Sequence, residues 1–260
     1  MPKIAVIGAG SYGTALGGIL AENGYDIDYY DPEKEKERLK DIVDGAKAIL
    51  VSAPSDVVMK LLFHLPQDKF LIVATKGFLS CKPFEEFSDW AILSGAGFAD
   101  DIKNKKCVYL TATNQRVIDL FKTESIVFDQ TNDKLGVLMC GALKNVYAIR
   151  AGELGLRPNT KRKEDYVSEV TDEMAVILAE NGAKPSTLKL ACGVKDLYLT
   201  CGENSRNYQF GKSRTNHEKV KNNMTVEGLA ALKRIKRGEI IVPDKAKILQ
   251  LIMEESEEWD

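Results

Sequence analysis

The chain has 260 residues, of which 44% are hydrophobic and 28% charged, and its net charge is −2. These values are typical of a globular protein with enough residues for one large domain or two moderate ones. The absence of a dominant basic tract does not favour nucleic acid as a partner. Since no run of about eighteen apolar residues occurs, we expect no membrane span.

The cysteines and histidines exclude two kinds of chemistry. None of the five cysteines forms a CxxC pair, and the apolar stretch at the N-terminus is too short for a signal peptide. We therefore expect reduced thiols and a cytoplasmic protein. The two histidines, His64 and His217, lie at no metal-ligand spacing. This predicts no metal site and assigns proton transfer to Lys, Asp, Glu or Tyr.

The first half of the chain alternates strand and helix signals. Short apolar, β-branched runs predict strands, and helical spacing predicts helices between them. The expected strands are 3–8, 25–31, 46–54, 69–77, 90–97, 107–113 and 125–130, of which 46–54, 69–77 and 90–97 include the beginning of the turn or loop that follows; the first expected helices are 11–24 and 55–65. Such alternation predicts a doubly wound, mainly parallel sheet.

The pattern changes near Asp133, after which strand signals almost vanish. The periodicity predicts helices over 133–151, 164–182, 187–200, 224–236 and 243–255. The chain is therefore expected to have an α/β N-terminal domain followed by an all-α C-terminal domain, with the boundary near residue 130.

A glycine motif links the first strand to the first helix. The stretch IAVIGAGSYG contains Gly8-x-Gly10-x-x-Gly13. The first glycine permits a tight turn, the second lets the backbone approach a pyrophosphate, and the third allows close helix–strand packing. The helix N-terminus attracts the phosphates. A plain glycine turn is the alternative, but the strand–loop–helix context favours a Rossmann-type NAD-binding domain over 1–130, which leaves 131–260 as the substrate and catalytic domain.

Asp31 lies at the end of the second expected strand, about twenty residues after the glycine loop. An acidic residue there binds the ribose 2′-hydroxyl and repels a 2′-phosphate, so NAD is preferred over NADP. The alternative is that Asp31 caps a helix beginning at Pro32, and the two roles are compatible.

Three later strands run into small-residue loops, VSAPS (51–55), ATKG (74–77) and SGAGFA (94–99). All three are expected at the carboxyl edge of the sheet, where ligands bind. Lys76 would project a cation into this crevice, one residue beyond its strand. A solvated surface lysine is the alternative.

The segment 137–152, VLMCGALKNVYAIRAG, is nearly all small or apolar except for Lys144. Reducing a ketone by hydride transfer creates an alkoxide, which needs a proton donor and charge stabilisation. With so few histidines, a buried lysine is the natural donor, and Asp196 could orient it. The alternative is a lysine that extends its head group to solvent from an amphipathic helix.

Together these motifs resemble the NAD(P)-dependent glycerol-3-phosphate dehydrogenase family. The matching stretches follow the family order and are GAGSYGTALG (8–17), VSAPS, TKG (75–77), SGAGFA, GALKNVYAI (141–149), DLYLTC (196–201), SRN (205–207) and VEG (226–228). Two stretches depart from the family pattern: SGAGFA replaces SGPSFA, and GLRPNTKRKEDY stands where a GDNARAAL-like segment is expected.

The resemblance implies a role for each matching residue. It implies that the catalytic residues are Lys144, Lys76 and Asp196. It implies that the cofactor-binding residues are Gly8, Gly10, Ser11, Tyr12, Gly13, Asp31, Lys76, Ala99, Arg206 and Glu227. It implies that the substrate-binding residues are Lys76, Gly95, Gly97, Lys144, Asp196, Ser205, Arg206 and Asn207. It also implies a homodimer formed through the helical domain.

We therefore expect an NAD-dependent sn-glycerol-3-phosphate dehydrogenase that interconverts dihydroxyacetone phosphate and glycerol 3-phosphate for phospholipid precursors. Two alternatives stay open. One is a reductase of another small 2-oxo acid or phosphorylated ketone. The other is a non-catalytic NAD-binding sensor of the same fold.

Overall fold

The computed structural model describes residues 1–32, 34, 38–216 and 225–258. The chain forms two compact units. Unit 1 comprises residues 1–76 and 81–134, and unit 2 comprises residues 77–80 and 135–260. In the part of the chain that the structure describes, no helix is long and apolar enough to cross a membrane.

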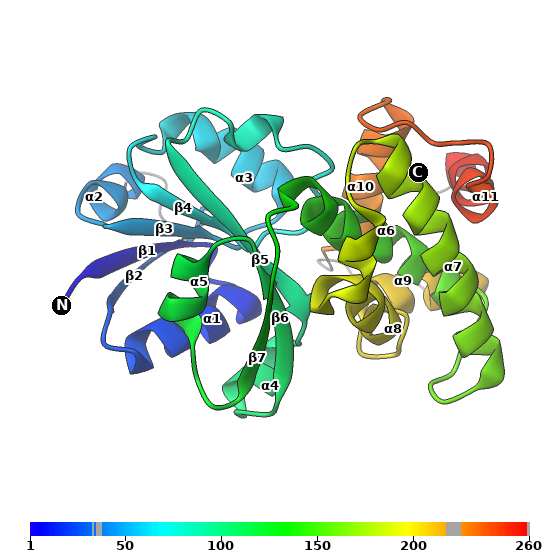
Figure 1. The fold of residues 1–260 in the computed structure, drawn as a ribbon, viewed down its shortest axis with the longest axis horizontal. Helices are drawn as coiled ribbons and strands as arrows, with labels where there is room; N and C mark the ends of the chain where they lie inside the picture. The colour runs from blue at the N-terminus through cyan, green and yellow to red at the C-terminus, as the bar shows by residue number, and fades with distance from the viewer. Residues whose placement is uncertain (33, 35–37, 217–224, 259–260) are drawn as a thin grey trace. The chain divides into compact units, whose positions relative to one another are not determined.

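Unit 1 is built on a seven-stranded sheet of the described residues, with the strand order β2-β1-β3-β4-β5-β6-β7 (Figure 1). The strands are β1 (Lys3–Ile7), β2 (Asp26–Tyr30), β3 (Ala48–Val51), β4 (Phe70–Val73), β5 (Asp89–Ala96), β6 (Val108–Ala112) and β7 (Ile126–Gln130). Strands β1, β3 and β4 are almost entirely buried, as expected of apolar runs covered on both faces. All neighbouring strands are parallel except β5 and β6, so the predicted mainly parallel, doubly wound sheet is confirmed.

Helices cover both faces of this sheet, with α1 and α5 on one face and α2 and α3 on the other (Figure 1). Side chains of α1 and α5 pack with those of the strands into one continuous apolar core. The helices of unit 1 are α1 (Ser11–Glu22), α2 (Leu39–Asp44), α3 (Ser55–Leu61), α4 (Ala99–Lys103) and α5 (Gln115–Phe121), with short 3-10 turns at Leu62–His64 and Lys82–Phe84.

The chain reverses its order around β1, because β2 lies on one side of β1 and β3 on the other. A reversal of this kind opens a crevice at the carboxyl ends of the strands, which is where open α/β sheets bind ligands. The residues that follow β1 and β3 therefore occupy the expected binding edge of unit 1.

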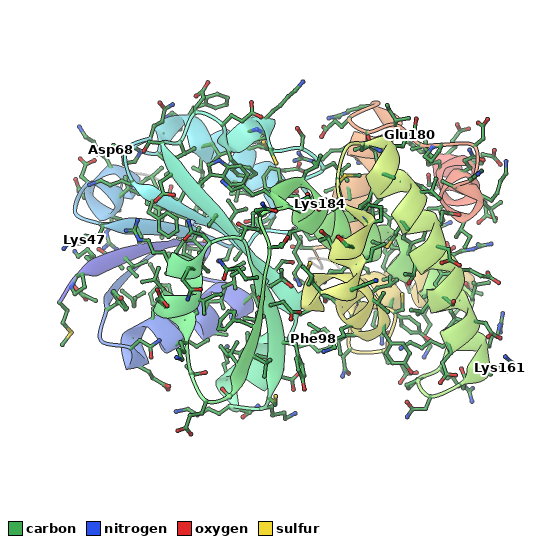
Figure 2. All side chains as sticks on the ribbon, viewed as in Figure 1. Lys47, Asp68, Phe98, Lys161, Glu180 and Lys184 are labelled. Carbon is green, nitrogen blue, oxygen red and sulfur yellow. The ribbon has the colours of Figure 1, made fainter. Side chains whose placement is uncertain are left out.

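Unit 2 is helical, and the predicted all-α character of the second half is confirmed. Its elements are α6 (Lys134–Glu153, of which the first residue belongs to unit 1), α7 (Lys161–Glu180), α8 (Asp196–Thr200), α9 (Arg206–Thr215), α10 (Glu227–Lys236) and α11 (Lys247–Glu255), with short turns at Pro185–Lys189, Ala191–Lys195 and Ser256–Glu258. Figure 2 labels Lys161 and Glu180, the first and last residues of α7.

Helix α6 is the centre of unit 2, with sixteen of its twenty residues buried. Glycines let α9 and α10 approach its backbone. A Cβ on Gly152 would lie 2.0 Å from the carbonyl oxygen of Tyr208, and one on Gly211 would lie 1.9 Å from that of Ile149. Both distances are far below contact distance, so the α6–α9 crossing depends on two residues without side chains.

Two predictions about the helices of unit 2 are wrong. The single helix expected over 187–200 is broken, because Gly193 has a non-helical conformation (φ −92°, ψ −118°) and only Asp196–Thr200 continue as α8. The polar stretch 204–214, for which no helix was expected, contains α9 instead. Its few apolar residues, among them Tyr208 and Phe210, are buried, so tertiary packing rather than a strong apolar period stabilises this helix.

Candidate active site

The glycine loop of unit 1 has the geometry that a dinucleotide requires. Gly8 has φ 108°, and a Cβ there would lie 2.5 Å from the amide nitrogen of Ala53. A Cβ on Gly13 would lie 2.0 Å from the carbonyl oxygen of Gly8. Gly10 is exposed, and a Cβ on it would meet nothing within 4 Å. Two glycines are thus required by packing, whereas the third leaves its face open to a ligand.

Gly10 is also the N-cap of α1, and no side chain caps that end of the helix. The first backbone N–H groups of an α-helix have no partner within the helix, and they attract anions. Among the predicted cofactor-binding residues, Ser11 and Tyr12 form this first turn. Ser11 is exposed and Tyr12 is half-buried.

The loop after β3 supports the glycine loop directly. The backbone N–H groups of Ser52 and Ala53 donate to the carbonyl of Ile7 at 2.8 and 3.1 Å, and the Ser52 hydroxyl donates to the carbonyl of Gly8 at 3.0 Å. Thr75 in turn donates to the carbonyl of Ala53 at 2.9 Å. The segments after β1, β3 and β4 therefore form one hydrogen-bonded edge.

Lys76 lies on this edge, three residues after the end of β4 rather than one residue beyond the strand as expected. Its Nζ lies 5.4 Å from the centre of the Tyr12 ring, within the range of a cation–π contact. This places the cation of Lys76 at the first turn of α1, beside the glycine loop.

Asp31 follows β2 directly and is partly exposed. Its carboxylate forms an ion pair with the Lys34 ammonium at 3.1 Å, and its backbone carbonyl accepts a hydrogen bond from the Lys34 N–H at 3.0 Å. Described residues after Pro32 form turns until α2 begins at Leu39, and positions 33 and 35–37 lie outside the described residues. A helix beginning at Pro32, the alternative reason for Asp31, therefore has no support from the described residues.

The SGAGFA segment is not the loop that the sequence predicts. Residues up to Ala96 belong to β5, where Gly95 pairs antiparallel with Leu110. A Cβ on Gly95 would lie 2.5 Å from the carbonyl oxygen of Tyr109, and Gly97 packs against Val108. Ala99 begins α4. Strand pairing therefore accounts for Gly95 without any ligand.

Lys144 and Asp196 form an ion pair inside unit 2. Lys144 projects from the middle of α6 and Asp196 from the first residue of α8, and their side chains are 1% and 2% exposed. Thr200, one turn later on α8, donates its hydroxyl to the Asp196 carbonyl at 2.6 Å and lies 3.3 Å from Oδ1 of the carboxylate. The structure thus brings together the two residues that the sequence proposed as acid/base and orienting group. A lysine extending to solvent is excluded for Lys144.

Two buried asparagine side chains form a hydrogen-bonded chain, and one of them, Asn145, directly follows Lys144 in the sequence. Asn207 donates to Oδ1 of Asn145 at 2.9 Å, and its own Oδ1 accepts from the Gly228 N–H at 2.9 Å. Asn145 donates to the Gly141 carbonyl at 3.0 Å. This amide chain joins α6, α9 and α10 through residues adjacent to Lys144, Arg206 and Glu227.

The three other predicted residues of unit 2 lie at helix ends. Ser205 is buried and is the N-cap of α9, Arg206 is the exposed first residue of that helix, and Glu227 is the half-buried first residue of α10. Sequence reasoning did not single out Thr200 or Asn145. Each carried a signal, because Thr200 follows Asp196 by one helical turn and Asn145 directly follows Lys144.

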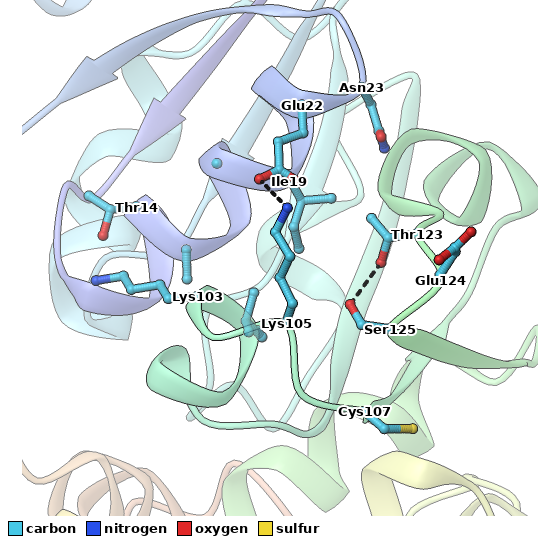
Figure 3. Close-up of a pocket in the computed structure, with 13 residues that line it drawn as sticks. Thr14, Ile19, Glu22, Asn23, Lys103, Lys105, Cys107, Thr123, Glu124 and Ser125 are labelled. Carbon is cyan, nitrogen blue, oxygen red and sulfur yellow. Dashed lines mark hydrogen bonds and ion pairs between the residues drawn. The ribbon is translucent and has the colours of Figure 1, made fainter.

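A separate hollow in unit 1 contains none of the predicted site residues. It has a volume of about 760 Å³ and is lined by the body of α1, the α4–β6 segment and residues 123–125 (Figure 3). An ion pair between Lys105 and Glu22, 3.1 Å, crosses it. Two of its charged side chains are thus paired with each other, and none of the residues expected to bind cofactor or substrate lines the hollow.

The arrangement in unit 1 is that of a dinucleotide-binding sheet, and unit 2 adds a buried lysine–carboxylate pair on helices. The sequence matches the family model for the NAD-dependent glycerol-3-phosphate dehydrogenase N-terminus over residues 3–40 and the corresponding C-terminus model over residues 133–252. The glycerol-3-phosphate dehydrogenase [NAD(P)+] of Citrifermentans bemidjiense is 32% identical, over 82% of this chain and 80% of that protein. The enzyme of the same name from Leptospira biflexa is 32% identical, over 80% and 78%. The chain belongs to the NAD(P)-dependent glycerol-3-phosphate dehydrogenase family.

Solved structures agree on the fold. Glycerol-3-phosphate dehydrogenase from Coxiella burnetii has a TM-score of 0.78 at 24% identity, and the match covers 99% of both chains. A ketopantoate reductase from Ralstonia eutropha has a lower TM-score of 0.55 at 15% identity, covering 98% of this chain and 99% of that one.

Proposed function

We propose that this protein is an NAD(P)-dependent sn-glycerol-3-phosphate dehydrogenase, which interconverts dihydroxyacetone phosphate and glycerol 3-phosphate. The observation that carries the proposal is the buried Lys144–Asp196 pair, found in a chain whose relatives of about 30% identity are named for this reaction. A ketone reduction needs a proton donor at the oxygen, and a buried lysine held by a carboxylate supplies one.

The glycine loop fits a dinucleotide, because Gly10 leaves its face open and the uncapped N-terminus of α1 offers backbone N–H groups to a pyrophosphate. Ser11 and Tyr12 would hold the cofactor there, and Asp31 would accept a hydrogen bond from the ribose. When bound, the reduced cofactor supplies the hydride. Asp31 favours NAD over NADP, because its carboxylate repels a 2′-phosphate.

In unit 2, Lys144 would give its proton to the substrate oxygen during reduction and take it back during oxidation. Asp196 would orient the ammonium and stabilise its charge. Arg206, exposed at the start of α9, would bind the substrate phosphate, since a guanidinium pairs with two phosphate oxygens. Lys76 of unit 1 would add positive potential for cofactor and substrate.

The test is oxidation of NADH and of NADPH with dihydroxyacetone phosphate, with Lys144→Ala as the control. Turnover in the wild type that is lost in Lys144→Ala supports the proposal. Turnover with ketopantoate or another 2-oxo acid, but not with dihydroxyacetone phosphate, would support the alternative reductase. Tight NADH binding without any turnover would favour a sensor.

Location and assembly are part of the same proposal. We expect a cytoplasmic protein that binds no nucleic acid and works as a homodimer, in glycerol-3-phosphate metabolism that feeds phospholipid biosynthesis. Sedimentation of the purified protein at micromolar concentration tests the dimer.

A further inference from the structure

A second lysine of unit 2 is buried, and the proposed reaction does not use it. Lys163 is the third residue of α7, and its side chain is only 2% exposed. It lies in the segment 155–166 that departs from the family pattern. No ion pair among the described residues includes Lys163. An ammonium buried without a carboxylate costs stability, so stability alone gives no reason for a lysine here.

The Lys163 ammonium contacts α8 and the residues just after it. Its Nζ lies 4.1 Å from the centre of the Tyr198 ring, and a Cβ on Gly202 would lie 3.4 Å from the same atom. The Tyr198 hydroxyl accepts from the backbone N–H of Asn159 at 3.3 Å, so Tyr198 of α8 is contacted both by Lys163 of α7 and by the loop just before α7.

A cation at this position is expected to favour the C-terminal end of α8. The last carbonyl groups of a helix have no partner within the helix, and positive charge near them is favourable. Helix α8 has only five residues, and a helix of that length has no stability of its own in water. Its geometry therefore depends on contacts such as the one from Lys163.

The other end of α8 carries Asp196. Thr200, which lies in the sequence between the two positions that Lys163 contacts, Tyr198 and Gly202, donates its hydroxyl to the Asp196 carbonyl at 2.6 Å and lies 3.3 Å from the carboxylate. A shift of the C-terminal end of α8 would move Thr200 and, through it, the carboxylate that pairs with Lys144.

We infer that Lys163 is a positioning residue, whose ammonium anchors the C-terminal end of α8 and thereby holds Asp196 in its ion pair with Lys144. The inference rests on the proposed function only in its effect on turnover. Lys163 itself is in contact with Tyr198 and the residues after α8, not with the lysine or the carboxylate of the candidate site.

The first test compares turnover of Lys163→Met and Lys163→Arg with that of Lys161→Met. Lys161 is the matched control, because it lies two residues earlier on α7 with a side chain that is 86% exposed and pairs only with Asp165 in the described structure (Figure 2). Lys163→Met is expected to lower kcat about 10- to 100-fold with KM for dihydroxyacetone phosphate within about 3-fold, since a small misplacement of a reacting group costs that much. Lys163→Arg, which keeps the charge, should recover most of kcat, and Lys161→Met should match the wild type.

Stability separates this role from a purely structural one. Lys163→Met removes a buried charge, so its urea midpoint should equal or exceed that of the wild type at pH 7 while kcat falls. Lys163→Gln is the second variant if the methionine variant does not fold. A kcat of either variant within 2-fold of the wild type would overturn the inference, and so would an equal loss in Lys161→Met.

The second test needs no turnover. In protein labelled with ¹⁵N-lysine, the ammonium signal of Lys144 is assigned by its loss in Lys144→Met. That signal should move or broaden in Lys163→Met and stay unchanged in Lys161→Met. If the wild type does not reduce dihydroxyacetone phosphate but the signal moves, the proposed function is wrong and the positioning role stands. An unmoved signal refutes the positioning role whatever the activity.

Discussion

The Lys144 ammonium is paired with the Asp196 carboxylate across two helices of unit 2, and neither side chain is more than 2% exposed. Removing one charge leaves the other buried and alone. We expect Asp196→Asn to lower the free energy of unfolding by about 3–5 kcal/mol. We also expect it to lower kcat about 100-fold or more, because Lys144, the proposed proton donor, would lose the carboxylate proposed to orient it. Urea denaturation and steady-state kinetics measure the two effects.

Replacing both members of the pair should separate stability from activity. In Lys144→Met with Asp196→Leu, no buried charge remains, so the double variant should recover much of the stability lost in Asp196→Asn. It should still be inactive. A double variant with measurable turnover would contradict the acid/base role of Lys144.

The carboxylate of Asp31 should determine which cofactor is used. Asp31→Ser removes the charge that repels a 2′-phosphate and leaves the cation of Lys34, which pairs with Asp31 in the wild type, near the same place. The ratio of kcat/KM for NADH to that for NADPH should fall about 10-fold or more, which corresponds to at least about 1.4 kcal/mol. Lys34→Ser is the matched control and should move the ratio in the opposite direction or leave it unchanged. A wild type that prefers NADPH would refute the argument.

The amide of Asn207 should be needed for the shape of unit 2. In Asn207→Asp the side chain still accepts from the Gly228 N–H, but an oxygen then faces Oδ1 of Asn145 where a donor was. A buried acceptor left without its donor costs about 1–3 kcal/mol. The melting temperature should fall accordingly, whereas Gln209→Glu on the same helix, which loses only an exposed hydrogen bond to the Glu203 carbonyl, should lower it less.

The thiol of Cys201 should be unreactive in the folded protein. Burial raises the pKa of Cys201 to about 12, although Lys163 and Lys144 act in the opposite direction. At pH 8 almost none of it is thiolate, and the residue is fully buried. Iodoacetamide should therefore modify the exposed Cys107 first, as mass spectrometry of the peptides would show. Modification of Cys201 at a similar rate would mean that α8 opens readily.

Stability should depend on pH through Lys163. Burial lowers the pKa of Lys163 from 10.5, so between the lowered value and 10.5 the unfolded chain holds more protons than the folded one. The destabilisation caused by burying this ammonium therefore decreases as the pH rises through that window. Below the window the destabilisation is fully present. The wild type should gain stability relative to Lys163→Met as the pH rises from 8 toward 10.5. A constant difference would indicate that the ammonium is not desolvated.

The sheet of unit 1 could be predicted because each strand is a short apolar run whose burial follows from its own residues. The glycine loop could be predicted equally well, because the spacing of its three glycines by itself specifies the conformation of the loop. The antiparallel pairing of β5 with β6 could not be predicted, because nothing within SGAGFA distinguishes a strand from a loop until Leu110 of β6 lies opposite Gly95.

In unit 2 the candidate site could be predicted by residue type but not by contact. Lys144 and Asp196 were expected to act together, yet Thr200 and the amide chain from Asn145 depend on which helices meet. Helix α9 escaped prediction because its mean hydropathy is low and its apolar residues matter only against α6. Lys163 was missed because a lysine in a charged segment normally indicates a solvated face, and only the fold turns it inward.

The close crossing of α6 and α9 has a consequence for motion. With carbonyl groups of Tyr208 and Ile149 seated against Gly152 and Gly211, the two backbones are in direct contact and no side chain between them can change rotamer to let them slide. Thermal fluctuations should therefore carry α6 and α9 together as one body. The distance between the backbone at Lys144 and at Arg206 should then stay constant on the timescale of loop motions, so that the proposed proton donor and the proposed phosphate-binding cation keep their spacing without any ligand to hold them.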